Sequence, residues 1–323
     1  MKRTVAVLFI LLMLILGELL PAHATGDACS VPTVAQGEDR VTRFLLLGCD
    51  RSTKLTDSIL LVSVNETQKC VSILQIPRDT YAEYTDRDYK KLNGGMQARG
   101  ERGIKTFLSE ALGVPIQYFL VLKLDFFRKL VDAIGGVEVE IPQDMVYSDP
   151  SQDLEIMLPK GKMRLGGKEA EQFVRYRSGY VNADLGRLDA QKVFLRAFAK
   201  QCKSLSPGVI LRILGLALTG VSTDVGAVDA VRVLKTLLTC DPDTVPMATL
   251  TGQAVQGKSG AWYYVLNRSG ACRMLNEFAF PSTPIREDCF DPRGLFLREG
   301  NERFAKIYFA DPGQLPLDSI CSS

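Results

Sequence analysis

The sequence contains almost no histidine. His23 is its one histidine, and it lies near the amino terminus beside a predicted cleavage site, so the folded part has none. This absence excludes Ser-His-Asp and Cys-His catalysis, histidine metal ligands and a phosphohistidine intermediate. Any acid-base chemistry must therefore fall to Asp, Glu, Lys or Tyr, and any metal must be a hard cation held by carboxylates.

The sequence also has little net charge. Its 39 Lys and Arg residues stand against 37 Asp and Glu, a formal charge of +2. We expect no nucleic-acid partner, because such a balance gives no general attraction to a polyanion, and any anion must bind at a local cluster. Internal repeats and low-complexity tracts are absent as well. A chain of 323 residues that is 46% hydrophobic is typical of one large or two modest globular domains.

No C-x-x-C pair occurs among the eight cysteines, which argues against a zinc or redox site. An even number of cysteines permits disulfides outside the cytoplasm, but the spacing does not fix the pairing. We favour a bond between Cys272 and Cys289, which flank a proline-containing loop.

The amino terminus predicts export. A basic start at residues 1–3 precedes an almost wholly apolar run over residues 4–17, and Ala22-His23-Ala24 offers a small-residue cleavage site. The run is short for a membrane span and Glu18 interrupts it. Residues 1–24 are therefore a signal peptide or a signal-anchor, and the protein is either released or anchored.

Three apolar segments predict strands at residues 43–48, 58–65 and 70–76, the last two as a hairpin. Pro77 ends the third strand and presents Arg78-Asp79 at the strand end, where α/β sheets usually hold their chemistry.

Further elements follow along the chain. A strand at 116–124, a helix at 125–134 and a strand at 137–141 predict a crossover unit, with Asp125 as the helix cap. Residues 143–168 indicate loops. The remaining expectations are a short helix from Lys168, a helix at 188–203, a helical pattern over 207–238 capped at Thr223-Asp224, strands around 262–266 and a helix at 271–277.

Arginines gather around residue 175. Arg175 and Arg177 are two apart, so on an extended segment they would point the same way. Helical spacing then places Asp184, Arg187, Leu188 and Gln191 on one face. Three converging guanidiniums favour an anion with several charges, such as a pyrophosphate or phosphodiester. The alternative is that each arginine pairs with a surface carboxylate.

With these motifs assembled, the sequence resembles the LytR-CpsA-Psr family of cell-envelope phosphotransferases. The motifs stand in family order within residues 43–200: Leu47-Gly48-Cys49-Asp50, Thr56-Asp57-Ser58, Ile76-Pro77-Arg78-Asp79-Thr80, Lys91-Leu92-Asn93, Val131-Asp132-Ala133-Ile134-Gly135-Gly136-Val137, Val174-Arg175-Tyr176-Arg177, and Asp184-Leu185-Gly186-Arg187 with Gln191. The resemblance implies an α/β fold, an α/β/α sandwich around a mixed central sheet with an apolar lipid pocket. We expect a linker at 25–40, the catalytic domain at 41–290 and a tail at 291–323.

The resemblance also implies a reaction. Family members transfer a glycopolymer from a polyprenyl-pyrophosphate carrier to peptidoglycan or a related acceptor, which places the protein at the membrane surface, on the outer face of the cytoplasmic membrane or in the cell wall. Asp50 and Asp57 correspond to ligands of Mg²⁺ or Mn²⁺. The pyrophosphate clamp corresponds to Arg78, Arg175, Arg177 and Arg187, with Gln191 beside them. Asp79 is our candidate for the base that takes the acceptor proton.

Several alternatives stay open. Many members have an arginine two residues before the second aspartate, where this chain has Leu55. Either Lys54 or Arg51 replaces that arginine, or the donor binds more weakly. A hydrolase of the same donor and a non-catalytic phosphoglycan-binding surface protein are the competing functions. The carboxylates of Asp50 and Asp57 argue against the non-catalytic binding protein, because a pure anion-binding site gains nothing from carboxylates beside its arginines unless a cation bridges the two. An aromatic face formed by Phe127, Phe194 and Phe198 is either plain core or part of the lipid pocket.

Overall fold

The computed structural model describes residues 39–49, 55–82, 90–150, 154–178, 183–203, 205–206, 208–209, 212–213, 216, 220–256 and 260–287. The predicted leader and tail lie outside these ranges. Among the described residues, no helix has the length and apolar character needed to cross a membrane. The chain divides into two compact units, one within Leu122–Val245 and one within Ala28–Val121 and Pro246–Ser323. We call them the first and the second unit.

The second unit is built on an antiparallel meander of three strands, β1 (Val41–Cys49), β2 (Thr56–Asn65) and β3 (Cys70–Gln75). Leu45 lies opposite Leu61, and Leu61 lies opposite Leu74. All three leucines are fully buried. Alternating and continuous apolar runs thus gave the strands correctly, and the predicted β2–β3 hairpin is confirmed.

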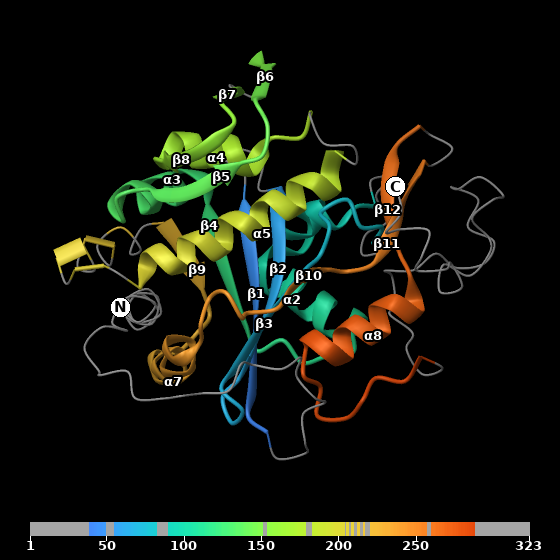
Figure 1. Ribbon diagram of the computed structural model, residues 1–323. Coiled ribbons are helices and arrows are strands. Elements are labelled where there is room, and N and C mark those ends of the chain that lie inside the picture. The colour runs from blue at the N-terminus through green and yellow to red at the C-terminus, as the bar shows by residue number, and fades with distance from the viewer. Residues whose placement is uncertain are drawn as a thin grey trace. The chain divides into compact units, whose positions relative to one another are not determined.

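The sheet is mixed and six-stranded. Its order is β10-β3-β2-β1-β4-β9, with β4 at Tyr118–Lys123, β9 at Val221–Thr223 and β10 at Met247–Thr249 (Figure 1). β10 runs parallel to β3, while β1, β2 and β3 are antiparallel. The predicted α/β fold with a mixed central sheet and flanking helices is therefore confirmed.

Two helices of the second unit flank its strands. η2 (Leu92–Gly94) leads directly into α2 (Gly95–Ala111), which buries Ile104, Phe107, Leu108 and Ala111. α8 (Arg268–Phe278) is capped by Asn267, whose side chain accepts a hydrogen bond from the Gly270 amide at 2.7 Å. A two-stranded sheet of β11 (Gly252–Gln256) and β12 (Trp262–Leu266) completes this unit.

Arg43 ties β1 to the residues that follow α8. Its Nε donates to the Ala279 carbonyl at 2.5 Å, its Nη2 to the Phe280 carbonyl at 2.7 Å, and its Nη1 to the Pro115 carbonyl at 3.2 Å. Burial lowers the pKa of Arg43 to about 10. A buried guanidinium persists here because carbonyl oxygens take up its donors.

The first unit begins with α3 (Leu124–Ala133) and β5 (Val137–Ile141), whose side chains alternate between buried and exposed. β5 pairs antiparallel with β8 (Gly161–Leu165) in a sheet of its own. The predicted crossover unit is therefore wrong, because the strand after the helix joins a different sheet from the strand before it.

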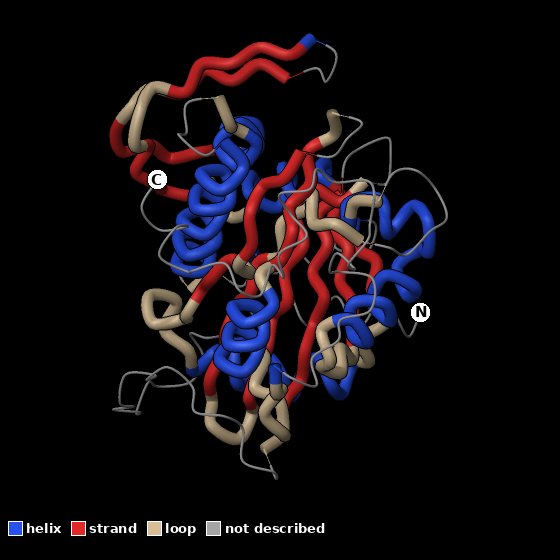
Figure 2. Tube along the Cα trace, turned by 90° about the vertical axis from the view of Figure 1, so that its right-hand side faces the viewer, coloured by secondary structure: helices blue, strands red, loops and turns tan. Residues whose placement is uncertain are grey.

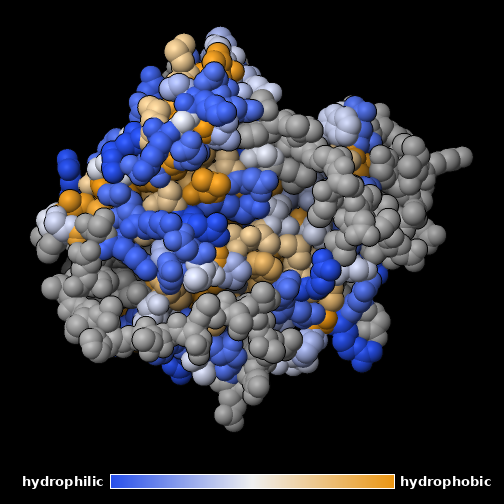
Figure 3. All heavy atoms as spheres, in the orientation of Figure 1, coloured by the Kyte–Doolittle hydropathy of each residue, from blue (hydrophilic) through white to orange (hydrophobic). Residues whose placement is uncertain are grey.

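Residues 143–168 are not loop-rich, and that expectation is also wrong. β6 (Met145–Asp149) and β7 (Leu154–Leu158) form a hairpin there, opposite each other in register (Figure 2). Val146 and Met157 face each other on its exposed side. A few hydrophobic residues lie among hydrophilic ones at the top of the view, where this hairpin lies (Figure 3).

Further helices of the first unit are α4 (Gly167–Arg175), α5 (Ala183–Cys202) and α7 (Ala227–Thr239). Two predicted caps are wrong. Lys123 is the N-cap of α3 while Asp125 lies in its first turn, and Gly226 is the N-cap of α7. Thr223 belongs to β9, so a strand interrupts the helical pattern predicted for residues 207–238.

The predicted disulfide involves one residue that the structure leaves undescribed. Cys289 lies outside the described ranges. The Cys272 thiol donates a hydrogen bond to the Ile285 carbonyl at 3.0 Å. Burial, followed by the Glu287 charge, raises the pKa of Cys272. Cys272 is a free, buried thiol in this structure, so the predicted Cys272–Cys289 bond is wrong here.

Candidate active site

A row of ion-paired side chains lies directly after β3 in the second unit. Arg78 makes an ion pair with Asp57, the second residue of β2. Arg78 Nε lies 3.6 Å from Asp79 Oδ2, and Lys91 Nζ donates to Asp79 Oδ1 at 3.0 Å. Four residues from three segments thus alternate in sign. Arg78 and Asp79 follow β3 closely, as the sequence predicts.

Backbone hydrogen bonds hold this segment from two sides. The Asn93 amide donates to the Arg78 carbonyl at 2.9 Å, and the Leu92 amide donates to the Thr80 carbonyl at 2.8 Å. On the other side, the Tyr264 amide of β12 donates to the Asp79 carbonyl at 2.8 Å. Arg78 and Asp79 are therefore fixed in place although they lie outside any strand.

Lys91 received no role in the sequence analysis beyond its place in a motif. Besides binding Asp79, its ammonium group lies 5.7 Å from the centre of the Tyr263 ring. Lys91 directly precedes η2, which leads into α2. The signal for Lys91 was the pair of lysines beside glycines, but its partner is set by a fold contact that spacing does not reveal.

Oxygen donors near Asp57 fit a hard cation. The Thr56 hydroxyl donates to the Asn93 carbonyl at 3.1 Å, so Asn93 is next to the start of β2. Asn93 Oδ1 is buried and accepts no hydrogen bond from any described residue. Carboxylate and amide oxygens are suitable ligands for Mg²⁺, which needs only one or two carboxylates beside substrate phosphates. Asp50 follows Cys49 in sequence and lies outside the described ranges, within which no group of three acidic, Cys or His ligands occurs.

In the first unit, Arg175 is the last residue of α4. The prediction that Arg175 and Arg177 share an extended segment is therefore wrong, because only Arg177 lies beyond the helix. Arg175 Nη1 donates to Glu171 Oε1 at 2.8 Å, and Arg128 Nε donates to the other oxygen of the same carboxylate. A carboxylate does bind Arg175, as the alternative held, but it is a buried one.

Helix α5 presents the other predicted residues of this unit. Arg187, Leu188 and Gln191 are buried on one face, as their spacing predicts. Gln191 Nε2 donates to the Val174 carbonyl at 3.2 Å, which places Gln191 beside the end of α4. The side chain of Asp184 is not described.

The aromatic residues of α5 belong to the core of the first unit. Phe194 is buried, with its ring centre 5.4 Å from that of Phe127 and 6.1 Å from that of Phe198. The neighbouring Val193 is 46% exposed. The plain-core interpretation accounts for Phe194.

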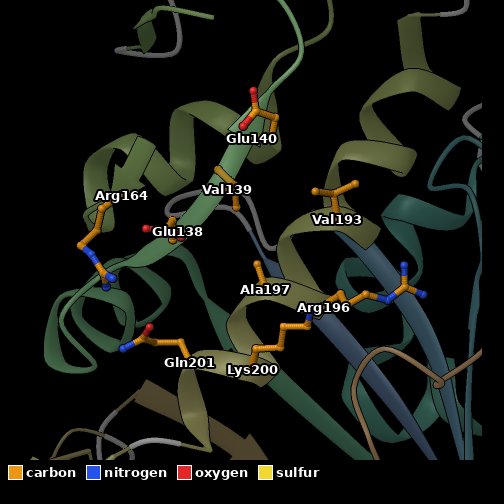
Figure 4. Close-up of a pocket in the computed structure, with 9 residues that line it drawn as sticks. All are labelled: Glu138, Val139, Glu140, Arg164, Val193, Arg196, Ala197, Lys200 and Gln201. Carbon is orange, nitrogen blue, oxygen red and sulfur yellow. The ribbon is translucent and has the colours of Figure 1, made fainter. Parts of the chain in front are cut away.

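A cavity of about 480 Å³ lies between β5 and α5 of the first unit (Figure 4). Glu138 and Glu140 line it from β5, and Val193 and Ala197 line it from α5. Arg164, Arg196 and Lys200 add further charge. Such a lining does not suit a polyprenyl chain, so the predicted apolar lipid pocket stays a prediction.

The sequence model of the LytR_cpsA_psr family matches residues 23–279, most of the chain. The chain belongs to the LytR-CpsA-Psr family. The family resemblance of its sequence motifs is thereby confirmed.

Two curated relatives share the name polyisoprenyl-teichoic acid–peptidoglycan teichoic acid transferase. TagV of Bacillus subtilis is 30% identical over 155 residues, which cover 47% of this chain and 40% of TagV. TagU of Oceanobacillus iheyensis is 28% identical over 254 residues, which cover 74% of this chain and 76% of TagU. The crystal structure of B. subtilis TagV matches with a TM-score of 0.63 at 23% identity, covering 76% of this chain and 99% of that one. At that identity the structural match supports the fold.

Proposed function

We propose that this LytR-CpsA-Psr protein transfers a glycopolymer phosphate from a polyprenyl-pyrophosphate carrier to peptidoglycan or a related cell-wall acceptor. The observation that carries the proposal is membership of the family together with relatives named as teichoic acid transferases. In the reaction, the acceptor hydroxyl forms a phosphodiester and polyprenyl phosphate leaves. The proposal places the protein at the membrane surface, on the outer face of the cytoplasmic membrane or in the cell wall.

The charged residues suit phosphoryl transfer, which depends on positioning and charge neutralisation more than on covalent protein chemistry. We assign Arg78 to the donor phosphates, because its ion pair with Asp57 and the backbone bonds around it fix its guanidinium. Arg175, Arg177 and Arg187, with Gln191, have the same assignment in the first unit. Each of these arginines supplies a planar fork of hydrogen-bond donors that matches phosphate oxygens.

Asp79 is assigned the proton transfer. Lys91 holds one of its carboxylate oxygens at 3.0 Å, which keeps the group in one orientation. In the proposed step the acceptor hydroxyl gives its proton to Asp79 while the bond from phosphorus to the carrier oxygen breaks. A base held in this way needs no histidine, in agreement with the composition of the chain.

Mg²⁺, or Mn²⁺, is the proposed cofactor, with Asp57, Asp50 and the Asn93 amide oxygen as its ligands. Asn93 is included because its buried oxygen has no hydrogen-bond donor among the described residues. When bound, the cation would neutralise charge on the donor phosphates.

The test follows a labelled glycan from a polyprenyl-pyrophosphate carrier to isolated peptidoglycan, with Mg²⁺ and with a chelator. We expect labelled peptidoglycan with the metal and none with the chelator. Equal transfer in both removes the metal from the mechanism. Free glycan phosphate without an adduct would identify a hydrolase, and donor binding without either product would identify a non-catalytic binding protein.

A further inference from the structure

Helices α3 and α4 of the first unit approach each other very closely. A Cβ atom on Gly167 would lie 2.3 Å from the Arg128 carbonyl oxygen, and the Gly167 amide donates to Asp132 Oδ1 at 2.7 Å. Arg128 and Asp132 are four residues apart on α3, as Gly167 and Glu171 are on α4, so one stripe of each helix faces the other. This contact holds the Arg128 side chain against α4.

Glu171 binds two arginines at once. Arg128 Nε donates to its Oε2, and Arg175 Nη1 donates to its Oε1 at 2.8 Å. Since both guanidiniums bind the same carboxylate, they are held a short and fixed distance apart. A single carboxylate does not neutralise both guanidiniums, so the two arginines keep an attraction for an anion.

The exposed part of this group is cationic. The Glu171 side chain is 1% exposed, whereas those of Arg128 and Arg175 are 30% and 19% exposed. Among the described residues, Glu171 is the one side-chain partner of Arg128. The terminal nitrogens of Arg128 therefore keep their donors for a ligand, in the planar fork that matches phosphate oxygens.

We propose that Arg128 and Arg175 form a two-arginine binding site for the pyrophosphate group of the donor, with Glu171 as the positioning residue. This inference rests on the proposed function and extends it to residues outside the family motifs. A purely structural ion pair between α3 and α4 would affect stability and leave anion binding unchanged.

The test measures binding of inorganic pyrophosphate to the full chain by calorimetry, together with the unfolding midpoint of each variant. We expect Arg128→Met and Arg175→Met each to weaken binding by about tenfold to hundredfold, because each removes charge-assisted hydrogen bonds. Arg232→Met is the matched control. Arg232 is a 33% exposed arginine of the same unit that pairs with Asp229 at 2.9 Å, and its loss should leave binding unchanged.

Glu171→Gln separates positioning from simple charge. Glutamine has no charge and only one acceptor oxygen, so it cannot offer each guanidinium a charged oxygen of its own, although the variant adds positive charge to the site. We expect weaker pyrophosphate binding. Tighter binding would overturn the positioning role, because general electrostatic attraction would then decide the affinity.

Unchanged binding in Arg128→Met beside a loss in Arg175→Met would overturn this inference and leave the proposed function intact. If Arg128→Met does not fold, Arg128→Lys replaces it, since lysine keeps the charge but not the fork. We expect about threefold to tenfold weaker binding in that variant, and wild-type affinity would again overturn the inference. Normal pyrophosphate binding without glycan transfer would instead count against the proposed function alone.

Discussion

Replacing Asp57 by asparagine tests the charged residues after β3. The Asp57 and Arg78 side chains are 39% and 20% exposed, and ion pairs this open to solvent contribute about 0.2–1 kcal/mol to stability. Asparagine keeps the size of the side chain and one oxygen that accepts a hydrogen bond from Arg78. We therefore expect the unfolding midpoint of Asp57→Asn to fall by at most about 4 °C.

Turnover in the same variant should fall much further. Removal of one preorganised charged group from a reaction of this class costs about 10² to 10³ in rate, equivalent to about 2.7–4 kcal/mol. That is several times the expected loss of stability, so the two effects separate. Glycan transfer at saturating donor and thermal unfolding are measured on the same preparation.

Glu66→Gln is the matched control for Asp57→Asn. Glu66 follows the other end of β2, where it accepts a hydrogen bond from the Thr42 hydroxyl at 2.6 Å, so the same charge is removed from the same hairpin. Its turnover should equal that of the wild type. Asp57→Asn turnover within about threefold of the wild type would refute the assignment. A midpoint lowered by more than about 10 °C would refute it as well, since Asp57 would then be structural.

Three further predictions concern the first unit. Phe194→Ala should lower the free energy of unfolding of this unit in urea by about 3–5 kcal/mol, because the ring is buried against Phe127 and Phe198. The variant should weaken the binding of long-chain and short-chain donors equally. A selective loss of long-chain donor binding at normal stability would favour a lipid role. Gly167→Ala should cost about 1–3 kcal/mol by the same measurement, because its Cβ would meet the Arg128 carbonyl, and wild-type stability would contradict that contact. Burial raises the pKa of Cys202 from 9.0 to about 12, so the folded state holds the thiol proton more tightly. The contribution of this thiol to the free energy of unfolding is complete below the pKa that the thiol has in the unfolded chain, and it is lost as the pH rises from 9.0 to about 12. Urea unfolding should therefore give a lower free energy of unfolding at about pH 10.5 than at about pH 8, and the difference should be smaller in Cys202→Ala.

Local pattern was sufficient for the strands of the second unit and for the place of Arg78 and Asp79. The apolar runs of β1, β2 and β3 are short and end at turn residues, which favours strands over helices, and Pro77 cannot continue a ladder. The same logic failed at residues 143–168. Strands of five residues, the last of which begins at Gly161 and is followed by Gly166, resemble loops in sequence, and their pairing partners decide that they are strands.

The arginines show where spacing stops being informative. Glu171 and Arg175 are four residues apart, so their ion pair was readable once the helix α4 was extended to Arg175. The contact of Arg128 with Glu171 was not readable, because it depends on how closely α3 and α4 pack. Lys91 is a similar case, since its bond to Asp79 requires the η2 turn to lie beside the segment after β3.

The hydrogen bonds of Arg43 have a consequence for the order of events in folding. Arg43 lies in the first strand, and its carbonyl partner Ala279 is 236 residues later. During synthesis β1 therefore exists long before the groups that satisfy its buried guanidinium. Pairing over such a separation is slow, because the loop must close before the contact stabilises anything. Chains cut short before Ala279 should consequently remain open to proteases, and the second unit should become protected in a single late step.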